Sequence, residues 1–281
     1  MPAFAGMTFP CLYVALLVAY GTGGCYSNGL TVVTTCGHGR AVRGSDSVGG
    51  GRGSIMPTII KGPHRVSDPT EIANLQAMAA QLAHPSGAAG TAIAANMNVA
   101  NARLAERAIA ALAVLPGQSP PEIGPGNGRL SMDLVRRLGE GGRYTAMELS
   151  PDMARECRAN LGELSACAVN IINTDCRTAA LIPESVDAVF GTNFVYFLDD
   201  LTQFLQSAYR WLKPGGRLVI GIRSKTAMAA LPFTPFGFRL REASEIVAAM
   251  AALGWREIRD EYHDDEGERE INGLVVKVDA H

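Results

Sequence analysis

The chain has 281 residues, of which 47% are hydrophobic and 19% charged, and its formal net charge is −2. This composition is typical of a globular protein and allows one large domain or two small ones. It excludes disorder throughout the chain. A net charge so close to zero, without a basic run, also argues against nucleic acid or an anionic membrane as the main partner.

Residues 1–55 differ from the rest of the sequence. They hold 12 of the 31 glycines and show no amphipathic period, so we do not expect them to pack a core. The apolar run Phe9 to Tyr20 is shorter than the roughly 20 residues that a membrane-spanning helix needs. A secretory signal is the alternative, but no Lys or Arg precedes the run. We predict a non-domain extension, either disordered or a gene-start artefact with Met56 as the true initiator.

The six cysteines are too few for a disulfide scaffold in a chain of this length, and none are spaced as CxxC. They are interpreted as reduced thiols of a cytoplasmic protein. The five histidines are scattered without the spacing of metal ligands, so the sequence predicts no metal site. It does not predict an oligomeric state.

Residues 56–281 have the periodicity of a folded domain. Apolar residues at three- and four-residue spacings predict two helices, 70–82 and 92–112, before any strand. From residue 121, short β-rich runs alternate with helical stretches, which is typical of a parallel sheet with crossover helices. The strands are expected at 122–124, 144–149, 168–173, 186–190 and 217–222, and the helices at 129–138, 151–161, 198–212 and 243–253.

The last two strands are expected at 255–262 and 271–279. The acidic stretch between them is too short for a crossover helix, so they should pair antiparallel. The predicted fold class is therefore α/β: a doubly wound, seven-stranded, mostly parallel sheet with an antiparallel last strand. Residues 56–115 would form a helical cap and residues 116–281 the sheet core.

A glycine-rich loop, Glu122-Ile-Gly-Pro-Gly-Asn-Gly128, follows the first predicted strand and precedes a helix. A parallel sheet presents its ligand crevice at such a position, and glycines let the backbone approach a ligand closely. A nicotinamide dinucleotide is disfavoured, because counting G-x-G-x-x-G/A from Gly124 and Gly126 places Arg129 at the third position.

The chain resembles the class I S-adenosylmethionine-dependent methyltransferases, in which an E/D-x-G-x-G-x-G loop wraps the amino acid end of the cofactor. The matching residues are Glu122, Gly124, Gly126 and Gly128. Further landmarks follow in family order, at Met-Glu-Leu-Ser-Pro151, Thr-Asp-Cys176, Val-Asp-Ala-Val-Phe-Gly191 and Leu-Lys-Pro-Gly-Gly216. The resemblance covers residues 85–279 approximately, and it implies the same fold and S-adenosyl-L-methionine as cofactor.

The resemblance also implies roles for single residues. Glu148 would bind the ribose hydroxyls, since a carboxylate accepts two charge-assisted bonds from a vicinal diol. Asp175 and Cys176 would lie at the adenine, with Asp175 accepting from the exocyclic amine. Asn193 and Tyr196 follow the fourth strand, where family members line the methyl-transfer site, although both could serve packing alone.

Other residues are weaker candidates. Asp175 and Asp187 could be catalytic, but each more often serves a turn or the cofactor. Phe233, Phe236 and Phe238 lie in the loop after the fifth strand and could form either a substrate lid or a core plug. The motif His84-Pro-Ser-Gly87, followed by Asn96-Met97-Asn98 and Asn101, looks like the N-terminal helices of one bacterial subgroup of small-molecule-type methyltransferases, where such helices cover the cofactor.

The sequence thus predicts S-adenosylmethionine-dependent methyl transfer to a small-molecule acceptor. The segment after the fourth strand reads Gly-Thr-Asn-Phe-Val-Tyr, without the Asn/Asp-Pro-Pro-Tyr/Phe motif of the branch that methylates nucleic acid amino groups. Neither the acceptor nor the methylated atom is predicted. Two alternatives stay open: a non-catalytic cofactor-binding or assembly protein on the same fold, and a nicotinamide-dependent oxidoreductase.

Overall fold

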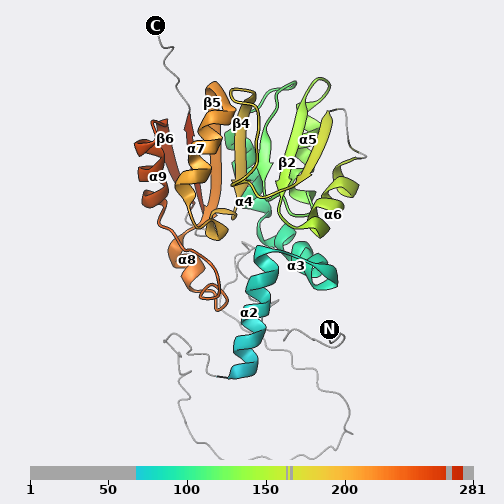
Figure 1. Ribbon diagram of the computed structural model, residues 1–281, viewed down its shortest axis with the longest axis vertical. Coiled ribbons are helices and arrows are strands. Elements are labelled where there is room, and N and C mark those ends of the chain that lie inside the picture. Colours follow the sequence, from blue (N-terminus) through green and yellow to red (C-terminus); the bar gives the residue numbers. More distant parts are fainter. Residues whose placement is uncertain (1–67, 163, 165–166, 264–267, 275–281) are drawn as a thin grey trace, which may run out of the picture.

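The computed structural model describes residues 68–162, 164, 167–263 and 268–274. The predictions for residues 1–55 lie outside this part of the chain. The described chain is built on one seven-stranded sheet with the strand order β3-β2-β1-β4-β5-β7-β6. Figure 1 shows this sheet at the centre of the molecule with helices on both of its faces. The predicted α/β fold class is confirmed.

Neighbours among the first five strands pair in parallel, while β7 pairs antiparallel with both β5 and β6. The antiparallel last strand is therefore confirmed. The strands are β1 (Pro121–Ile123), β2 (Arg143–Glu148), β3 (Ala168–Asn173), β4 (Val186–Thr192), β5 (Leu212–Arg223), β6 (Arg256–His263) and β7 (Glu268–Leu274).

Two apolar clusters form the core, one on each face of the sheet. One packs α4, α5 and α6 against the strands, and the other packs α7 and α9. The helices are α2 (Pro69–Ala83), α3 (Gly87–Ala100), α4 (Ala102–Leu112), α5 (Met132–Leu138), α6 (Pro151–Gly162), α7 (Leu201–Trp211), α8 (Lys225–Ala229) and α9 (Ala243–Ala252), with 3₁₀ turns η1 (Arg129–Ser131) and η2 (Val195–Phe197).

The structure corrects the helix count before the sheet. The predicted helix 92–112 is two helices, because the backbone leaves helical geometry at Asn101, which ends α3 and begins α4. Asparagine competes with helical hydrogen bonding, and here its side-chain amide donates to Met97 Sδ at 3.7 Å. Helix α8 was not predicted. Strand β7 begins at Glu268, three residues before the predicted start.

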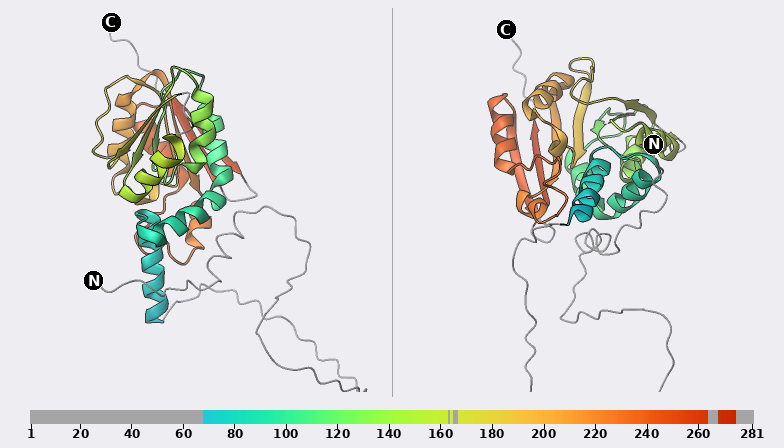
Figure 2. Two further views of the ribbon diagram at one scale, coloured as in Figure 1. Left: turned by 90° about the vertical axis from the view of Figure 1, so that its right-hand side faces the viewer. Right: turned by 60° about the horizontal axis from the view of Figure 1, so that its bottom comes forward.

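Helices α2 and α3 cover one end of the sheet rather than one of its faces. Figures 1 and 2 show them beyond the strand ends, on the side where α8 also lies. Leu75, Met78 and Ala79 of α2 are buried and join the same core cluster as α7 and α9. The end of the sheet that α2 and α3 cover is the one at which the parallel strands finish, and it is where the site lies.

Among the residues described, no helix has the length and apolar character needed to cross a membrane. The same residues contain no group of three or more His, Cys, Asp or Glu side chains placed to hold a metal ion.

Candidate active site

A cavity of about 260 Å³ opens at the carboxyl ends of the parallel strands. Residues at or directly after the ends of β1, β2, β3, β4 and β5 line it, and α2 and α3 supply the opposite wall. This is the position at which doubly wound sheets bind their ligands. We call the part beside the ends of β1, β2 and β3 the β1–β3 side, and the part beside the ends of β4 and β5 the β4–β5 side.

The glycine loop after β1 turns through three residues with positive φ: Gly124 (+63°), Gly126 (+60°) and Gly128 (+77°). A side chain in this left-handed region is strained, which explains the residue type. A Cβ on Gly126 would meet no heavy atom within 4 Å, so open space lies above the loop. A Cβ on Gly128 would come within 2.6 Å of Cys157 Sγ. Gly128 does not line the cavity and instead lets the loop pack on α6.

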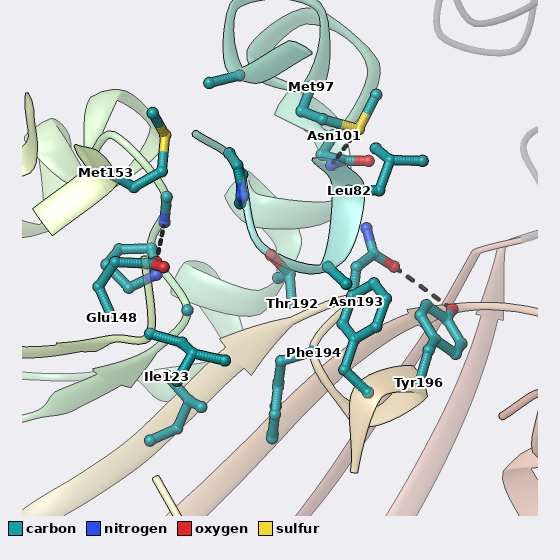
Figure 3. Close-up of a pocket in the computed structure, with 18 of the residues that line it drawn as sticks. Leu82, Met97, Asn101, Ile123, Glu148, Met153, Thr192, Asn193, Phe194 and Tyr196 are labelled. Carbon is teal, nitrogen blue, oxygen red and sulfur yellow. Dashed lines mark hydrogen bonds between the residues drawn. The ribbon is translucent and has the colours of Figure 1, made fainter. Parts of the chain in front are cut away.

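Glu148, at the end of β2, is 6% exposed and lines the β1–β3 side of the cavity. Its Oε1 accepts from the Ser150 backbone N–H, and its Oε2 accepts from the Gly126 N–H, each at 2.9 Å. Burial raises the pKa of the carboxyl, while these two amides act in the opposite direction. Each oxygen keeps a lone pair for a further donor. Glu148 therefore ties the glycine loop to α6 and retains acceptor capacity toward the cavity (Figure 3).

Glu122, at the base of the loop, belongs to a buried hydrogen-bonded group. Its Oε2 accepts from the Ser131 hydroxyl at 2.6 Å and from the Tyr144 hydroxyl at 2.5 Å. Desolvation raises the pKa of Glu122 to about 7, and the two hydroxyl donors only partly offset it. A positively charged ligand group above the loop would shift this carboxyl toward its ionised form.

Asp175 and Cys176 follow β3 and also line the cavity. The Asp175 carboxylate accepts from the Arg177 guanidinium, at 2.5 Å from Nη2 to Oδ2, and from the Arg177 backbone N–H. This ion pair holds the pKa of Asp175 below its usual range. Any donor that Asp175 takes from a ligand has to share the carboxylate with Arg177. Burial raises the pKa of the Cys176 thiol to about 12, so the thiol is neutral.

Asn193 and Tyr196 lie on the β4–β5 side. Asn193 has a φ of +56°, and its backbone N–H donates to the Gly221 carbonyl at 2.8 Å, which holds the side chain at the cavity (Figure 3). The Tyr196 hydroxyl donates to the Arg223 carbonyl at 2.9 Å and accepts from the Arg223 N–H at 2.7 Å. Both hydrogen bonds of the Tyr196 hydroxyl are therefore made to the backbone, and Tyr196 contributes its ring to the cavity wall.

The segment after α8 contributes apolar side chains to the cavity wall. Phe233 and Phe238 line the cavity, whereas Phe236 packs on the core and is not among the cavity-lining residues. The segment is fixed by Arg241, whose guanidinium donates to the carbonyls of Val195 and Leu198 in and beside η2. Two of the three phenylalanines therefore contact the cavity, and all three pack in or against the core, with Phe233 the most buried.

The cap is joined to α6 by three side-chain hydrogen bonds. The Ser150 hydroxyl donates to the Pro85 carbonyl at 2.5 Å, and Asp152 Oδ2 accepts from the Gly87 N–H at 2.7 Å. Thr91 Oγ1 donates to Glu156 Oε1 at 2.7 Å. Ser150 also donates its backbone N–H to Glu148, so one residue links the cavity carboxylate to the cap.

Most of the candidate residues converge on this one cavity. It brings together Glu122, Gly124, Gly126, Glu148, Asp175, Cys176, Asn193 and Tyr196.

Asp187 lies outside the cavity. Its carboxylate accepts from the Ser119 N–H and the Lys213 ammonium near the opposite end of β4, which is a structural role. The sequence analysis missed Ser150 as the link to the cap and Arg177 as the partner of Asp175. In a sequence, a serine before a proline is typical only of a helix start.

The donor set of the cavity fits S-adenosylmethionine. An open loop with exposed backbone, a carboxylate with spare lone pairs and a second carboxylate beside it match a ligand with an amino acid group, a diol and an amino-substituted base. We infer this fit from the chemistry of the residues present.

Comparisons with known proteins agree with the fold and the loop. Residues 121–220 match the family model described as a methyltransferase domain. The chain is 38% identical over 117 residues to the biotin biosynthesis bifunctional protein BioCD of Bordetella avium, a match that covers 42% of this chain and 24% of that protein. It is 29% identical over 121 residues to the ubiquinone biosynthesis O-methyltransferase of Xanthomonas campestris, covering 43% and 49%.

Among solved structures, the chain resembles a SAM-dependent methyltransferase from Aquifex aeolicus. The TM-score is 0.54 at 17% identity, over 74% of this chain and 99% of the other. This likeness concerns the fold. The matched region spans between a quarter and a half of the curated relatives named above.

The doubly wound sheet carries a glycine loop after β1 and an acid at the end of β2, as the resemblance to the methyltransferases implied. The family match over residues 121–220 and the fold together support a class I S-adenosylmethionine-dependent methyltransferase with S-adenosylmethionine as its cofactor.

Proposed function

We propose that the protein transfers the methyl group of S-adenosylmethionine to a small-molecule acceptor bound on the β4–β5 side of the cavity. The observation that carries this proposal is that one cavity has the glycine loop and Glu148 on one side and Asn193 with an aromatic wall on the other. The matched methyltransferase domain supports the same reaction.

In this proposal Glu148 binds the ribose hydroxyls, Gly124 and Gly126 admit the amino acid end above Glu122, and Asp175 with Cys176 borders the adenine. When bound, the cofactor would supply a methyl carbon made electrophilic by its positively charged sulfur, and transfer of that methyl group to a lone pair of the acceptor would leave a neutral thioether. The chain then has two tasks: to align the acceptor with that carbon and to exclude water.

The cavity residues are better suited to aligning the acceptor than to acting as a general acid or base. Among the described residues on the β4–β5 side, no carboxylate or imidazole lines the cavity. The Tyr196 hydroxyl is held by the Arg223 backbone. We propose that Asn193 and the Tyr196 ring position the acceptor, and that its proton passes to bulk water once the methylated product leaves the cavity. Buried free thiols at Cys157, Cys167 and Cys176 support a reducing, cytoplasmic location.

Turnover tests the proposal. The full chain is incubated with methyl-labelled S-adenosylmethionine and a metabolite extract, and labelled products and S-adenosylhomocysteine are identified. We expect labelled product from the wild type and much less from the Glu148→Ala variant. A protein that binds the cofactor but yields neither product with any extract would instead be a non-catalytic binding or assembly protein.

A further inference from the structure

Four aromatic rings gather on the β4–β5 side of the cavity, around Phe238. Ring centroids lie 4.8 Å from Phe238 at Phe197, 5.6 Å at Phe233 and 6.2 Å at Tyr196. All four residues line the cavity. Rings at these separations pack at angles to one another and offer flat apolar surface to a ligand.

The cap closes this region from the other direction. Figure 3 shows Leu82, Met97 and Asn101 reaching in from α2 and α3, opposite Asn193. Met228 and Leu231, both buried, also line the cavity. Methionine side chains adapt to irregular apolar ligands, so the chamber is suited to apolar contact over most of its surface.

Charge is distributed unequally over the cavity. The three carboxylates that line it, Glu122, Glu148 and Asp175, all belong to the β1–β3 side. On the β4–β5 side the one charged side chain among the described lining residues is Arg223, which is 8% exposed and donates from Nη2 to the Ala100 carbonyl at 2.7 Å. A cation entering here would lose water without meeting a carboxylate, and an anion would compete with contacts that Arg223 already makes.

Apart from Arg223, the polar side chains offered to an acceptor are uncharged and comprise the Thr192 hydroxyl and three amides. Asn98, Asn101 and Asn193 line the cavity, and Asn193 Oδ1 lies 3.4 Å from the Tyr196 hydroxyl. Within the described part of the chain, no hydrogen bond is found for the Asn193 side-chain NH₂. It can therefore donate to a hydroxyl or carbonyl oxygen of a ligand.

From these observations we propose that the acceptor is an uncharged, mostly apolar molecule that carries a flat ring and at least one hydroxyl or carbonyl group, with the ring against Phe238 and the polar group at Asn193. This inference rests on the proposed function, because it assumes that the β1–β3 side holds the cofactor.

Three probes that share one ring and differ in charge test the inference: 2-naphthol, 2-naphthoate and 2-naphthylmethylammonium. Their binding is measured by calorimetry at pH 7 with saturating S-adenosylhomocysteine. We expect 2-naphthol to bind at least about tenfold more tightly than either charged probe, a difference of about 1.4 kcal/mol. A charged probe that binds as tightly as 2-naphthol, or failure of all three to bind, overturns the proposal.

Variants locate the binding. Asn193→Asp replaces a neutral amide by a carboxylate of the same shape, so it should strengthen binding of the ammonium probe and weaken that of naphthoate. Phe238→Ala should weaken all three probes about tenfold, whereas Phe236→Ala, whose ring is not in the cavity wall, should leave them unchanged. If Asn193→Asp does not fold, Asn98→Asp replaces it. Unchanged ranking in a folded charge variant contradicts the assignment.

S-adenosylhomocysteine serves as the internal control. If it does not bind the wild type, the proposed function itself has failed. If it binds and the probes do not rank as expected, only the acceptor class is wrong.

Discussion

The two buried glutamates of the cavity have different tasks. Glu148 accepts two backbone N–H bonds that fix its direction, and it keeps lone pairs facing the cavity. Glu122 is bonded to two hydroxyls beneath the loop and is held partly in its neutral form by desolvation. We therefore propose that Glu148 binds the ligand directly and that Glu122 tunes the electrostatics of the loop.

The Glu148→Gln variant tests direct binding. The amide keeps the shape of the side chain but loses the charge that strengthens bonds to a diol, at about 1.5–3 kcal/mol for hydrogen bonds to a charged group. Cofactor affinity measured by calorimetry should fall about 10- to 150-fold. Asp133→Asn, an exposed carboxylate on α5, is the control. Equal affinity of the folded Gln variant and the wild type would reject the ribose role.

The pKa of Glu122 makes stability depend on pH. The pKa is about 7 in the folded chain against an ordinary value of 4.5, so the folded state binds this proton more tightly than the unfolded state. The tighter binding of this proton stabilises the folded state fully below pH 4.5, and this stabilisation is lost as the pH rises to about 7.

A shift of this size corresponds to about 3 kcal/mol of unfolding free energy. Urea unfolding should therefore show the wild type losing up to about that much more than Glu122→Gln between pH 4.5 and 7.5. Parallel pH profiles of the two proteins would show that Glu122 is not perturbed.

Gly126 and Gly128 distinguish a ligand-facing glycine from a packing glycine. Both have positive φ, so alanine at either position costs about 1–2 kcal/mol of backbone strain. Gly128→Ala adds a clash with Cys157 and should lower the thermal midpoint much more than Gly126→Ala. Gly126→Ala should remain folded and lose cofactor affinity, because its Cβ enters the open space above the loop. Equal loss of stability in both variants would contradict this division.

At the scale of elements, the contact between α3 and α6 connects the β1–β3 side of the cavity to the cap. Ser150 is fully buried and bonds to Glu148, to Pro85 and to the Met153 N–H. Ligand binding at Glu148 is thus expected to stabilise the turn before α3. Thr91 reaches α6 separately, through Glu156.

Amide hydrogen exchange tests whether ligand binding at Glu148 stabilises the cap through Ser150. In the wild type, S-adenosylhomocysteine should slow amide exchange in residues 86–94. Ser150→Ala should reduce this ligand-dependent protection, whereas Thr91→Val, which removes a bond distant from Glu148, should retain it although basal exchange rises. Full ligand-dependent protection in Ser150→Ala would show that Ser150 does not connect the β1–β3 side of the cavity to the cap.

The periodicity of single elements explains what the sequence could predict. Strand β3 begins and ends as predicted, because its β-branched residues Val169, Ile171 and Ile172 favour an extended chain. The break at Asn101 was missed because apolar spacing continues across it and only the side-chain bond to Met97 favours the interruption. Similarly, the chemistry of the glycine loop was predictable from residue type, whereas the pairing of Asp175 with Arg177 depends on the geometry of one turn.

At the scale of the whole molecule, we propose that residues 56–281 fold without residues 1–55. The core clusters consist of described residues from Leu75 onward, and a chain that starts at Met56 retains all of them. Its thermal midpoint and cofactor affinity should equal those of the full chain. A fall of several degrees in the midpoint, equivalent to about 1 kcal/mol, would show that the first segment contributes to the fold.

The central claim is that the cavity at the carboxyl ends of the strands binds S-adenosylmethionine. Calorimetric titration of the full chain with S-adenosylmethionine, and separately with NADH, tests it most directly. The account predicts one-to-one binding of S-adenosylmethionine that is weakened in Glu148→Gln, with no binding of NADH. Binding of NADH instead, or S-adenosylmethionine affinity that Glu148→Gln leaves unchanged, would contradict it.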